Sequence, residues 1–148
     1  MDIRHVLLTT DLSEESERSF DAALSVAKKW GARITLLHVV LELQVTPHGA
    51  PFAPPITDPE AEAALGPARE KLEEYRTRLT DGVEVATEVV MAPDVAKGIC
   101  GWAEHHDADV IVMSTHGLSG FRRLILGSVT EEVLRCSDVP VLCVPRKE

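Results

Sequence analysis

The chain has 148 residues, a net charge of −9 and an apolar fraction of 45%, which suits one globular domain with a packed core. Its acidity argues against a nucleic-acid-binding protein, which normally presents a basic face to phosphates. No apolar run reaches the roughly 18 residues of a membrane span. The N-terminus lacks the basic start and apolar centre of a signal peptide, so we expect a cytosolic protein.

The first part of the chain predicts a strand, a helix and a second strand. The apolar run His5–Thr9 is typical of a strand, and Ser13 can cap the following helix, whose first turns are acidic. Apolar residues at helical spacing mark the buried side of this helix: Phe20, Ala23, Leu24, Ala27 and Trp30. Gly31 is suited to end the helix, and Ala32–Val40 predicts a strand covered on both faces.

A proline-rich segment follows over residues 41–59, where the prolines and Gly49 rule out a regular helix or a central strand. A loop of this length in a small domain is typical of a segment that covers a site. Pro59–Leu79 then predicts a second helix, which Gly66-Pro67 should kink or delay.

The rest of the chain continues the alternation. Strands are predicted at Val83–Val90, Asp109–Ser114 and Val139–Val144, with helices at Pro93–His106 and Gly127–Arg135. Such alternation predicts a single α/β domain with an open, parallel, five-stranded sheet and helices on both faces. Pro140 has no N–H group to donate, so the last strand is predicted to lie at an edge of the sheet.

The three cysteines, Cys100, Cys136 and Cys143, form no Cys-x2-Cys pair. Their odd number and their spacing predict buried thiols rather than disulfides or zinc ligands.

The loop after Asp109–Ser114 points most directly to a ligand, because ligands of open parallel sheets bind beyond the carboxyl ends of the strands. Gly117 and Gly127 can adopt backbone angles closed to other residues and let a ligand approach the main chain. Gly127 and Ser128 open a helix whose free N–H groups and positive dipole end suit an anion. The Ser128 and Thr130 hydroxyl groups add donors.

These residues also have plain structural interpretations. Gly127 and Ser128 can be only a tight helix entry and its N-cap, and Arg122 and Arg123 can be solvated loop charges instead of phosphate ligands. Asp11 follows the first strand, where it can accept hydrogen bonds from a ribose, place a metal ion on phosphates, or only cap a turn.

The side chains near the other strand ends leave the same choice open. Val39 can form an apolar wall for a flat base or simply belong to the core. His38 is interpreted as a core histidine with satisfied hydrogen bonds. His116 lies in the glycine loop, either near the phosphates or with a structural or solvent-exposed role.

Longer motifs carry a family resemblance. They are Asp109-Val-Ile-Val-Met-Ser-Thr-His-Gly117, Leu124-Ile-Leu-Gly-Ser-Val-Thr-Glu131 and Val139-Pro-Val-Leu-Cys-Val-Pro145, supported by Thr10–Ser16 and Leu36–Val40. Together they resemble the universal stress protein family over essentially the whole chain. The resemblance implies one such domain over residues 1–148, a Rossmann-like sheet of the adenine nucleotide alpha hydrolase-like type with strand order 3-2-1-4-5, and a homodimer through the last strand.

The ATP-binding branch of that family is marked by Gly-x2-Gly-x9-Gly-Ser/Thr, and this chain has Ser114-x2-Gly117-x9-Gly127-Ser128. The spacing is retained, but Ser114 replaces the first glycine, and its side chain needs room and restricts the backbone. The resemblance implies that Asp11 contacts the ribose or the phosphate-bound Mg²⁺ and that Val39 meets adenine. The candidate ligand-binding residues are Thr10, Asp11, Val39, Ser114, His116, Gly117, Gly120, Arg122, Gly127, Ser128, Val129 and Thr130.

Three functions follow from this pattern. The first is a cytosolic stress-response protein that binds ATP, with Mg²⁺, as a regulatory ligand. The second is a slow ATPase or a self-phosphorylating protein with Ser128 or Thr130 as acceptor, although the chain has neither a P-loop lysine motif nor a Gly-x-Ser-x-Gly elbow. The third is a dimeric interaction protein without nucleotide, which Ser114 favours.

Overall fold

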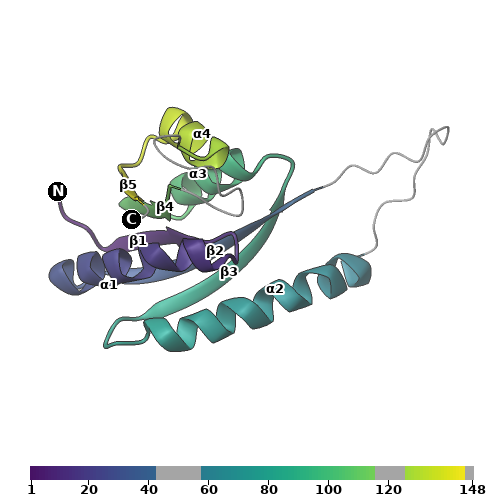
Figure 1. The fold of residues 1–148 in the computed structure, drawn as a ribbon, viewed down its shortest axis with the longest axis horizontal. Coiled ribbons are helices and arrows are strands. Elements are labelled where there is room, and N and C mark those ends of the chain that lie inside the picture. Colours follow the sequence, from purple (N-terminus) through teal and green to yellow (C-terminus); the bar gives the residue numbers. More distant parts are fainter. Residues whose placement is uncertain (43–57, 116–125, 146–148) are drawn as a thin grey trace.

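A computed structural model describes residues 1–42, 58–115 and 126–145. Its five strands form one parallel sheet in the order β3-β2-β1-β4-β5 (Figure 1). The strands are β1 (His5–Thr9), β2 (Arg33–Leu41), β3 (Val85–Ala92), β4 (Val110–Ser114) and β5 (Val141–Val144). The predicted α/β fold, the strand order and the edge position of the last strand are confirmed.

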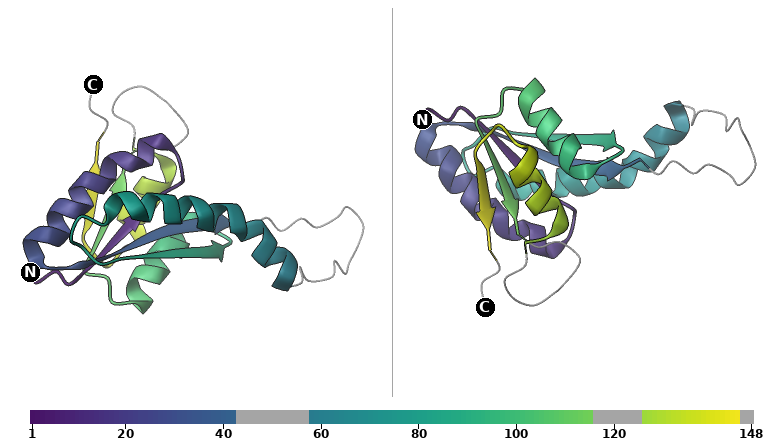
Figure 2. Two further views of the ribbon diagram at one scale, coloured as in Figure 1. Left: turned by 90° about the horizontal axis from the view of Figure 1, so that it is seen from below. Right: turned by 90° about the horizontal axis from the view of Figure 1, so that it is seen from above.

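The helices form a layer on each face of the sheet. They are the short 3₁₀ helix η1 (Glu14–Glu17) and the α-helices α1 (Arg18–Trp30), α2 (Asp58–Leu79), α3 (Val95–His105) and α4 (Ser128–Cys136). Helices α1 and α2 cover one face, and α3 and α4 cover the other (Figure 2). None of the helices in the described ranges combines the length and apolar character that a bilayer span requires.

Two apolar clusters fill the spaces between the layers, and β1 contributes to both. Val6 and Leu8 belong to the cluster under α1 and α2, whereas Leu7 belongs to the cluster under α3 and α4. This alternation follows from the period of two residues along a strand. Burial on both faces explains why the central strands are rich in consecutive apolar residues.

The start of the first helix differs in detail from the prediction. Ser13 is an N-cap, as predicted, and its side chain accepts a hydrogen bond from the Ser16 N–H, but it caps η1, so the α-helix proper begins at Arg18. Gly31 ends α1 with φ of 66°, as predicted. Trp30 was wrongly predicted to be buried, since 42% of it is exposed. Helical spacing identifies which side of a helix faces the sheet, but it does not show that the sheet extends as far as the last residue of the helix.

The second helix is longer than predicted. It begins at Asp58 and continues through Pro67 to Leu79, so Gly66-Pro67 does not delay its start. A proline lacks the N–H that would bond the carbonyl four residues earlier, here that of Ala63. Both Ala63 and Pro67 are exposed, so water can solvate this carbonyl.

The prediction of three free thiols was wrong. Cys100 of α3 and Cys136 of α4 form a disulfide, with a Cα–Cα distance of 6.4 Å, and Cys143 is free. The two residues are 36 positions apart in sequence, but their helices pack together on one face of the sheet. An odd number of cysteines is compatible with one disulfide and one thiol, and sequence spacing does not reveal which helices become neighbours.

Candidate functional site

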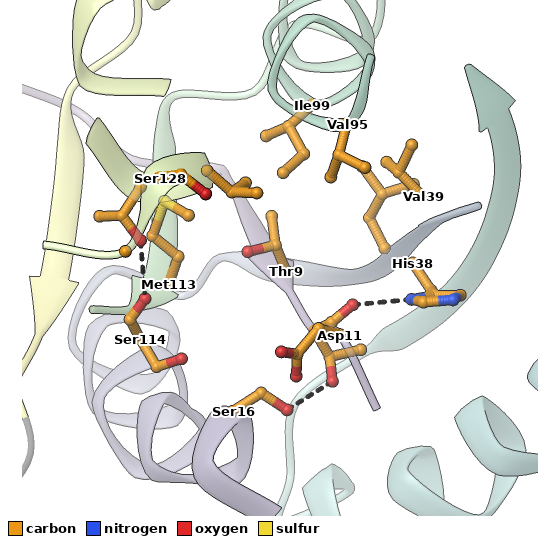
Figure 3. Close-up of a pocket in the computed structure, with 15 residues that line it drawn as sticks. Thr9, Asp11, Ser16, His38, Val39, Val95, Ile99, Met113, Ser114 and Ser128 are labelled. Atoms are coloured by element: carbon orange, nitrogen blue, oxygen red, sulfur yellow. Dashed lines mark hydrogen bonds between the residues drawn. The ribbon is translucent and has the colours of Figure 1, made fainter. Parts of the chain in front are cut away.

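A cavity of about 350 Å³ opens beyond the carboxyl ends of β1, β2 and β4. Strand β1 lies between β2 and β4, so the winding of the chain changes direction beside it, which is where open α/β sheets form ligand sites. The cavity volume falls in the range of small-molecule sites, about 300–1,000 Å³. Figure 3 shows that polar and apolar side chains occupy different parts of its wall.

The cavity brings together most of the residues that the sequence singles out. Its wall includes Thr10, Asp11, Val39, Ser114, Gly127, Ser128, Val129 and Thr130. Four further candidates, His116, Gly117, Gly120 and Arg122, lie outside the described residues, as does Arg123.

The turn after β1 positions Asp11. The Asp11 Oδ1 atom accepts hydrogen bonds from the Ser13 N–H at 3.0 Å and from the Ser13 hydroxyl. This is the aspartate turn that the plain interpretation predicts. It also fixes the direction of the carboxylate, which remains exposed at the cavity wall (Figure 3).

Leu12 gives this turn its unusual backbone. Its φ of 67° places a branched, non-glycine residue in the left-handed region. The Leu12 N–H donates to Thr10 Oγ1 at 3.0 Å, and the Leu12 carbonyl accepts from the Tyr75 hydroxyl at 3.2 Å. Burial, together with the nearby Glu17 carboxylate, raises the pKa of Tyr75 to about 12, which keeps this hydroxyl protonated as a donor.

The Thr10 hydroxyl is occupied within the turn. It lies 2.7 Å from the Ser16 hydroxyl and accepts from the Leu12 N–H. Because Ser16 donates its own proton to the Ser13 carbonyl at 2.7 Å, Thr10 must be the donor to Ser16. The predicted binding residue Thr10 therefore shapes the site through its turn, and its hydroxyl proton is not free for a ligand.

His38 is a wall residue of the cavity rather than a fully buried core histidine (Figure 3). Its Nδ1 lies 2.9 Å from the Thr10 carbonyl oxygen. A carbonyl can only accept, so Nδ1 carries the proton, and in the neutral ring Nε2 is an acceptor. The predicted satisfied hydrogen bond is present, but the ring joins the ends of β1 and β2 at the site.

The apolar part of the wall comes from β2 and α3. Val39 is 7% exposed, and Val95 and Ile99 project from α3 towards the same space (Figure 3). Gly98 allows this close approach, because a Cβ there would lie 3.0 Å from Val39 Cγ1 and 2.9 Å from Ala92 Cβ. We call this apolar part of the wall, formed by Val39, Val95 and Ile99, the apolar slot.

The N-terminus of α4 forms the opposite part of the wall. Gly127 is the N-cap residue, not Ser128, and its N–H donates to the Thr115 carbonyl at 2.8 Å. Its φ of −57° is open to any residue, so the predicted need for unusual backbone angles was wrong at this position. The next three N–H groups, of Ser128, Val129 and Thr130, have no acceptor within their helix because they belong to its first turn.

Thr130 connects α4 to β4. Its hydroxyl donates to the Ser114 carbonyl at 3.1 Å, and the residue is only 3% exposed. Ser128 is exposed and lines the cavity at the start of α4 (Figure 3). Of the two predicted hydroxyl donors, the one on Thr130 is therefore already used in a hydrogen bond within the protein.

The described cavity wall has few charged side chains. Asp11 is the one carboxylate among the described lining residues, and no described lysine or arginine lines the cavity. Within the same ranges, no group of three or more His, Cys, Asp or Glu side chains could hold a metal ion. Asp11 could serve as a single protein ligand of Mg²⁺, which commonly binds one or two carboxylates and completes its shell with phosphates and water.

Several wall residues were not predicted as parts of a site: Ser16, Leu37, Val95, Ile99 and Met113. Val95 and Ile99 are four positions apart, a spacing that places them on the same side of α3. The same spacing describes a helix face against a sheet and a helix face against a cavity. Gly98 permits close approach of α3 to β2 and β3, but a glycine at such a position occurs in both cases.

Comparison with known proteins gives the chain its family. The family model of the universal stress protein family matches residues 2–145. Among curated relatives, universal stress protein MJ0531 of Methanocaldococcus jannaschii is 32% identical over an alignment that covers 98% of this chain and 85% of the relative.

Solved structures share the fold. That of protein MJ0577, also from Methanocaldococcus jannaschii, has a TM-score of 0.81, is 28% identical and covers 100% of this chain and 99% of its own. A universal stress protein in complex with cAMP has a TM-score of 0.72 at 21% identity, covering 99% and 100% of the two chains. The universal stress protein of Archaeoglobus fulgidus in complex with dAMP has a TM-score of 0.63 at 19% identity, covering 97% and 98%. The chain belongs to the universal stress protein family.

Proposed function

We propose that this protein binds ATP, together with Mg²⁺, as a regulatory ligand in a cytosolic stress response. The observation that carries the proposal is the composition of one cavity. An apolar slot, a carboxylate and the first turn of a helix face the same space, which supports a site for a base, a ribose and a phosphate chain.

The base would occupy the slot between Val39 on β2 and the α3 residues Val95 and Ile99. These apolar side chains would pack against the faces of a purine ring. Two solved structures of the same fold contain cAMP and dAMP, which are both adenine nucleotides. They support adenine as the base for this chain as well.

The phosphates would bind the N–H groups of Ser128, Val129 and Thr130. A helix N-terminus stabilises an anion by about 0.3–1 kcal/mol for each favourable charge position. The motif residue Gly117 and the further candidates His116, Gly120 and Arg122 lie outside the described residues, and we propose from the sequence that they also contribute to phosphate binding. Asp11 would contact the ribose hydroxyls or Mg²⁺, because a bare carboxylate facing a triphosphate would otherwise repel it.

The test is an ATP titration by calorimetry with and without Mg²⁺, after bound nucleotide has been extracted from the purified protein. GTP and inorganic tripolyphosphate are the comparison ligands. ATP should bind more tightly than GTP because of the apolar slot, and more tightly than tripolyphosphate because the slot would then be empty. Equal binding of all three ligands, or no binding of ATP, would contradict the proposal.

A nucleotide-free interaction protein is the second candidate, and Ser114 in place of the first motif glycine favours it. In this case the active form would be a homodimer through β5, predicted over Val139–Val144. Leu142 is 39% exposed on this edge strand, and an exposed apolar edge is suited to pairing with a second copy. Light scattering of the nucleotide-free protein measures the assembly, and a monomer would contradict it.

Catalysis is the least supported of the three functions. Efficient phosphoryl transfer needs a positioned base and strong charge compensation. The buried Thr130 hydroxyl is bonded to the Ser114 carbonyl, which disfavours it as a phosphate acceptor and leaves Ser128. ADP release faster than in buffer would restore this candidate.

A further inference from the structure

A covalent bond joins the two helices on one face of the sheet. Cys100 lies in α3, Cys136 is the last residue of α4, and the two form a disulfide across the contact between these helices. The helices lie next to each other on the same face, as Figure 2 shows. The bond closes a loop that spans 36 sequence positions and contains β4.

The same two helices build different parts of the cavity wall. Helix α3 supplies Val95 and Ile99, and Cys100 directly follows Ile99 in the chain. Helix α4 supplies its N-terminal turn, seven positions before Cys136 at Val129. The disulfide therefore fixes the apolar slot relative to the helix terminus.

Helix α4 is held separately at its two ends. At the N-terminal end, the Thr130 hydroxyl bonds to the Ser114 carbonyl at 3.1 Å and the Gly127 N–H bonds to the Thr115 carbonyl at 2.8 Å. Val133, in the middle, is fully buried. At the C-terminal end, Cys136 is exposed and the disulfide provides the covalent link. Cleavage of that bond removes the covalent link between α3 and α4, while the hydrogen bonds to the end of β4 and the buried Val133 keep α4 on the sheet.

We propose that Cys100 and Cys136 are a reversible redox site that sets the nucleotide affinity of the cavity, with the disulfide form binding more tightly. The proposal rests on the proposed function, and it adds a regulatory input to the same site. Its physical basis is preorganisation, since a wall already fixed in the binding geometry loses less freedom when the ligand binds.

The reaction is thiol–disulfide exchange with a dithiol. One thiolate of the dithiol attacks Cys136 Sγ, which belongs to the more exposed partner, and the bond to Cys100 breaks with Cys100 leaving as a thiolate. The second thiol of the dithiol then attacks the mixed disulfide, so Cys136 leaves. Two electrons reach the protein, both cysteines take up a proton, and the dithiol becomes a cyclic disulfide.

The third cysteine does not compete in this exchange. Cys143 lies half-buried on β5, and burial raises the pKa of its thiol. A raised pKa lowers the thiolate fraction near neutral pH, and the thiolate is the attacking species. Cys143 also lies outside the described cavity wall, so its removal provides a control.

Thermodynamic linkage gives the proposal a second readout. If the disulfide form binds nucleotide more tightly by some factor, nucleotide must stabilise the disulfide against reduction by that same factor. A purely structural disulfide, remote in effect from the cavity, would show neither change.

The experiment measures the Kd of MgATP for the oxidised protein and for the protein reduced with excess dithiothreitol. Reduction should weaken binding by roughly fivefold or more, the lower end of typical coupling between sites. The Cys143→Ser variant should keep this response. The double variant Cys100→Ser/Cys136→Ser should bind as the reduced protein does and should not respond to dithiothreitol, with circular dichroism confirming that it is folded.

The companion measurement counts free thiols in buffers that contain different ratios of oxidised to reduced dithiothreitol, with and without saturating MgATP. The midpoint should shift towards more reducing buffers by the factor found in binding. Equal Kd values for the two redox forms, or three free thiols in the oxidised protein, would overturn the redox proposal alone. No ATP binding in either form would overturn both this proposal and the proposed function.

Discussion

The Gly127 N–H donates to the Thr115 carbonyl at 2.8 Å, so the residue before α4 lies against the chain that leaves β4. A Cβ on Gly127 would lie 3.0 Å from that same oxygen, which is backbone and cannot move aside as a flexible side chain would. The backbone angles of Gly127 are open to other residues. Space, and not conformation, therefore requires glycine at this motif position.

Gly127→Ala should lower the free energy of unfolding by about 1–3 kcal/mol, as crowding of a packed site does, and Gly127→Val should lower it further. Both variants should also weaken ATP binding, because the shift moves the first turn of α4. Urea unfolding and ATP titration measure the two effects.

The matched control for that pair is Gly101→Ala in α3, where an added Cβ meets nothing within 4 Å. It should raise the free energy of unfolding by roughly 0.5–1 kcal/mol, since alanine favours a helix interior over glycine. A Gly127→Ala protein as stable as the parent would show that Thr115 can retreat and that the steric argument is wrong.

Substitutions at Thr130 and Ser128 distinguish an effect on stability from an effect on ligand binding. Thr130→Val keeps the volume of the side chain but removes the hydroxyl that bonds to the Ser114 carbonyl, so stability should fall by about 1 kcal/mol. Ser128→Ala removes a less buried hydroxyl at the cavity and should change stability little while it weakens phosphate binding. If Ser128→Ala destabilised the protein more than Thr130→Val, these two roles would be reversed.

Asp11→Asn tests what the carboxylate contacts. The substitution keeps an oxygen that can accept from the Ser13 N–H, so the turn should survive, but it removes the charge. If Asp11 coordinates Mg²⁺, the variant should lose most of the Mg²⁺ dependence of ATP binding. A ribose contact instead predicts similar weakening with and without Mg²⁺. Calorimetry in the two buffers distinguishes these results, and an unchanged affinity in both would remove Asp11 from the site.

The elements were predictable because their signals are local. A strand buried on both faces must be an apolar run, as Val6–Leu8 is, and Gly31 and Pro140 constrain the backbone at their own positions. The wrong predictions concern contacts between distant segments. Nothing local to Cys100 or Cys136 shows that α3 and α4 become neighbours.

The site was predictable in part for the same reason. Asp11 and Gly127 were found because parallel strands place their carboxyl ends at one edge of the sheet. Val95 and Ile99 were missed as wall residues, because a helix face reads the same whether it covers a core or a cavity. The occupied Thr10 hydroxyl became visible only from its partner Ser16, since hydrogen-bond partners depend on the folded turn.

His5 makes stability depend on pH. The ring is 3% exposed, with Nε2 2.8 Å from Thr35 Oγ1 and Nδ1 3.1 Å from the His106 carbonyl. Burial lowers the pKa of His5 below its ordinary 6.5, and the Arg33 charge lowers it further, while the His106 carbonyl and the Asp109 carboxylate act in the opposite direction. Between the folded pKa and pH 6.5 the unfolded chain therefore binds a proton that most folded chains do not.

The contribution of His5 to stability should be fully present above pH 6.5 and should fall as the pH drops towards the folded pKa. Its slope cannot exceed about 1.4 kcal/mol per pH unit for one proton. Urea midpoints measured between about pH 7.5 and 5.5 should show the fall. Arg33→Gln removes a charge that opposes protonation, so the folded pKa should rise towards 6.5 and the fall should become smaller. A steeper fall in Arg33→Gln than in the parent would contradict the assignment, because it would mean that the Arg33 charge favours the protonated ring.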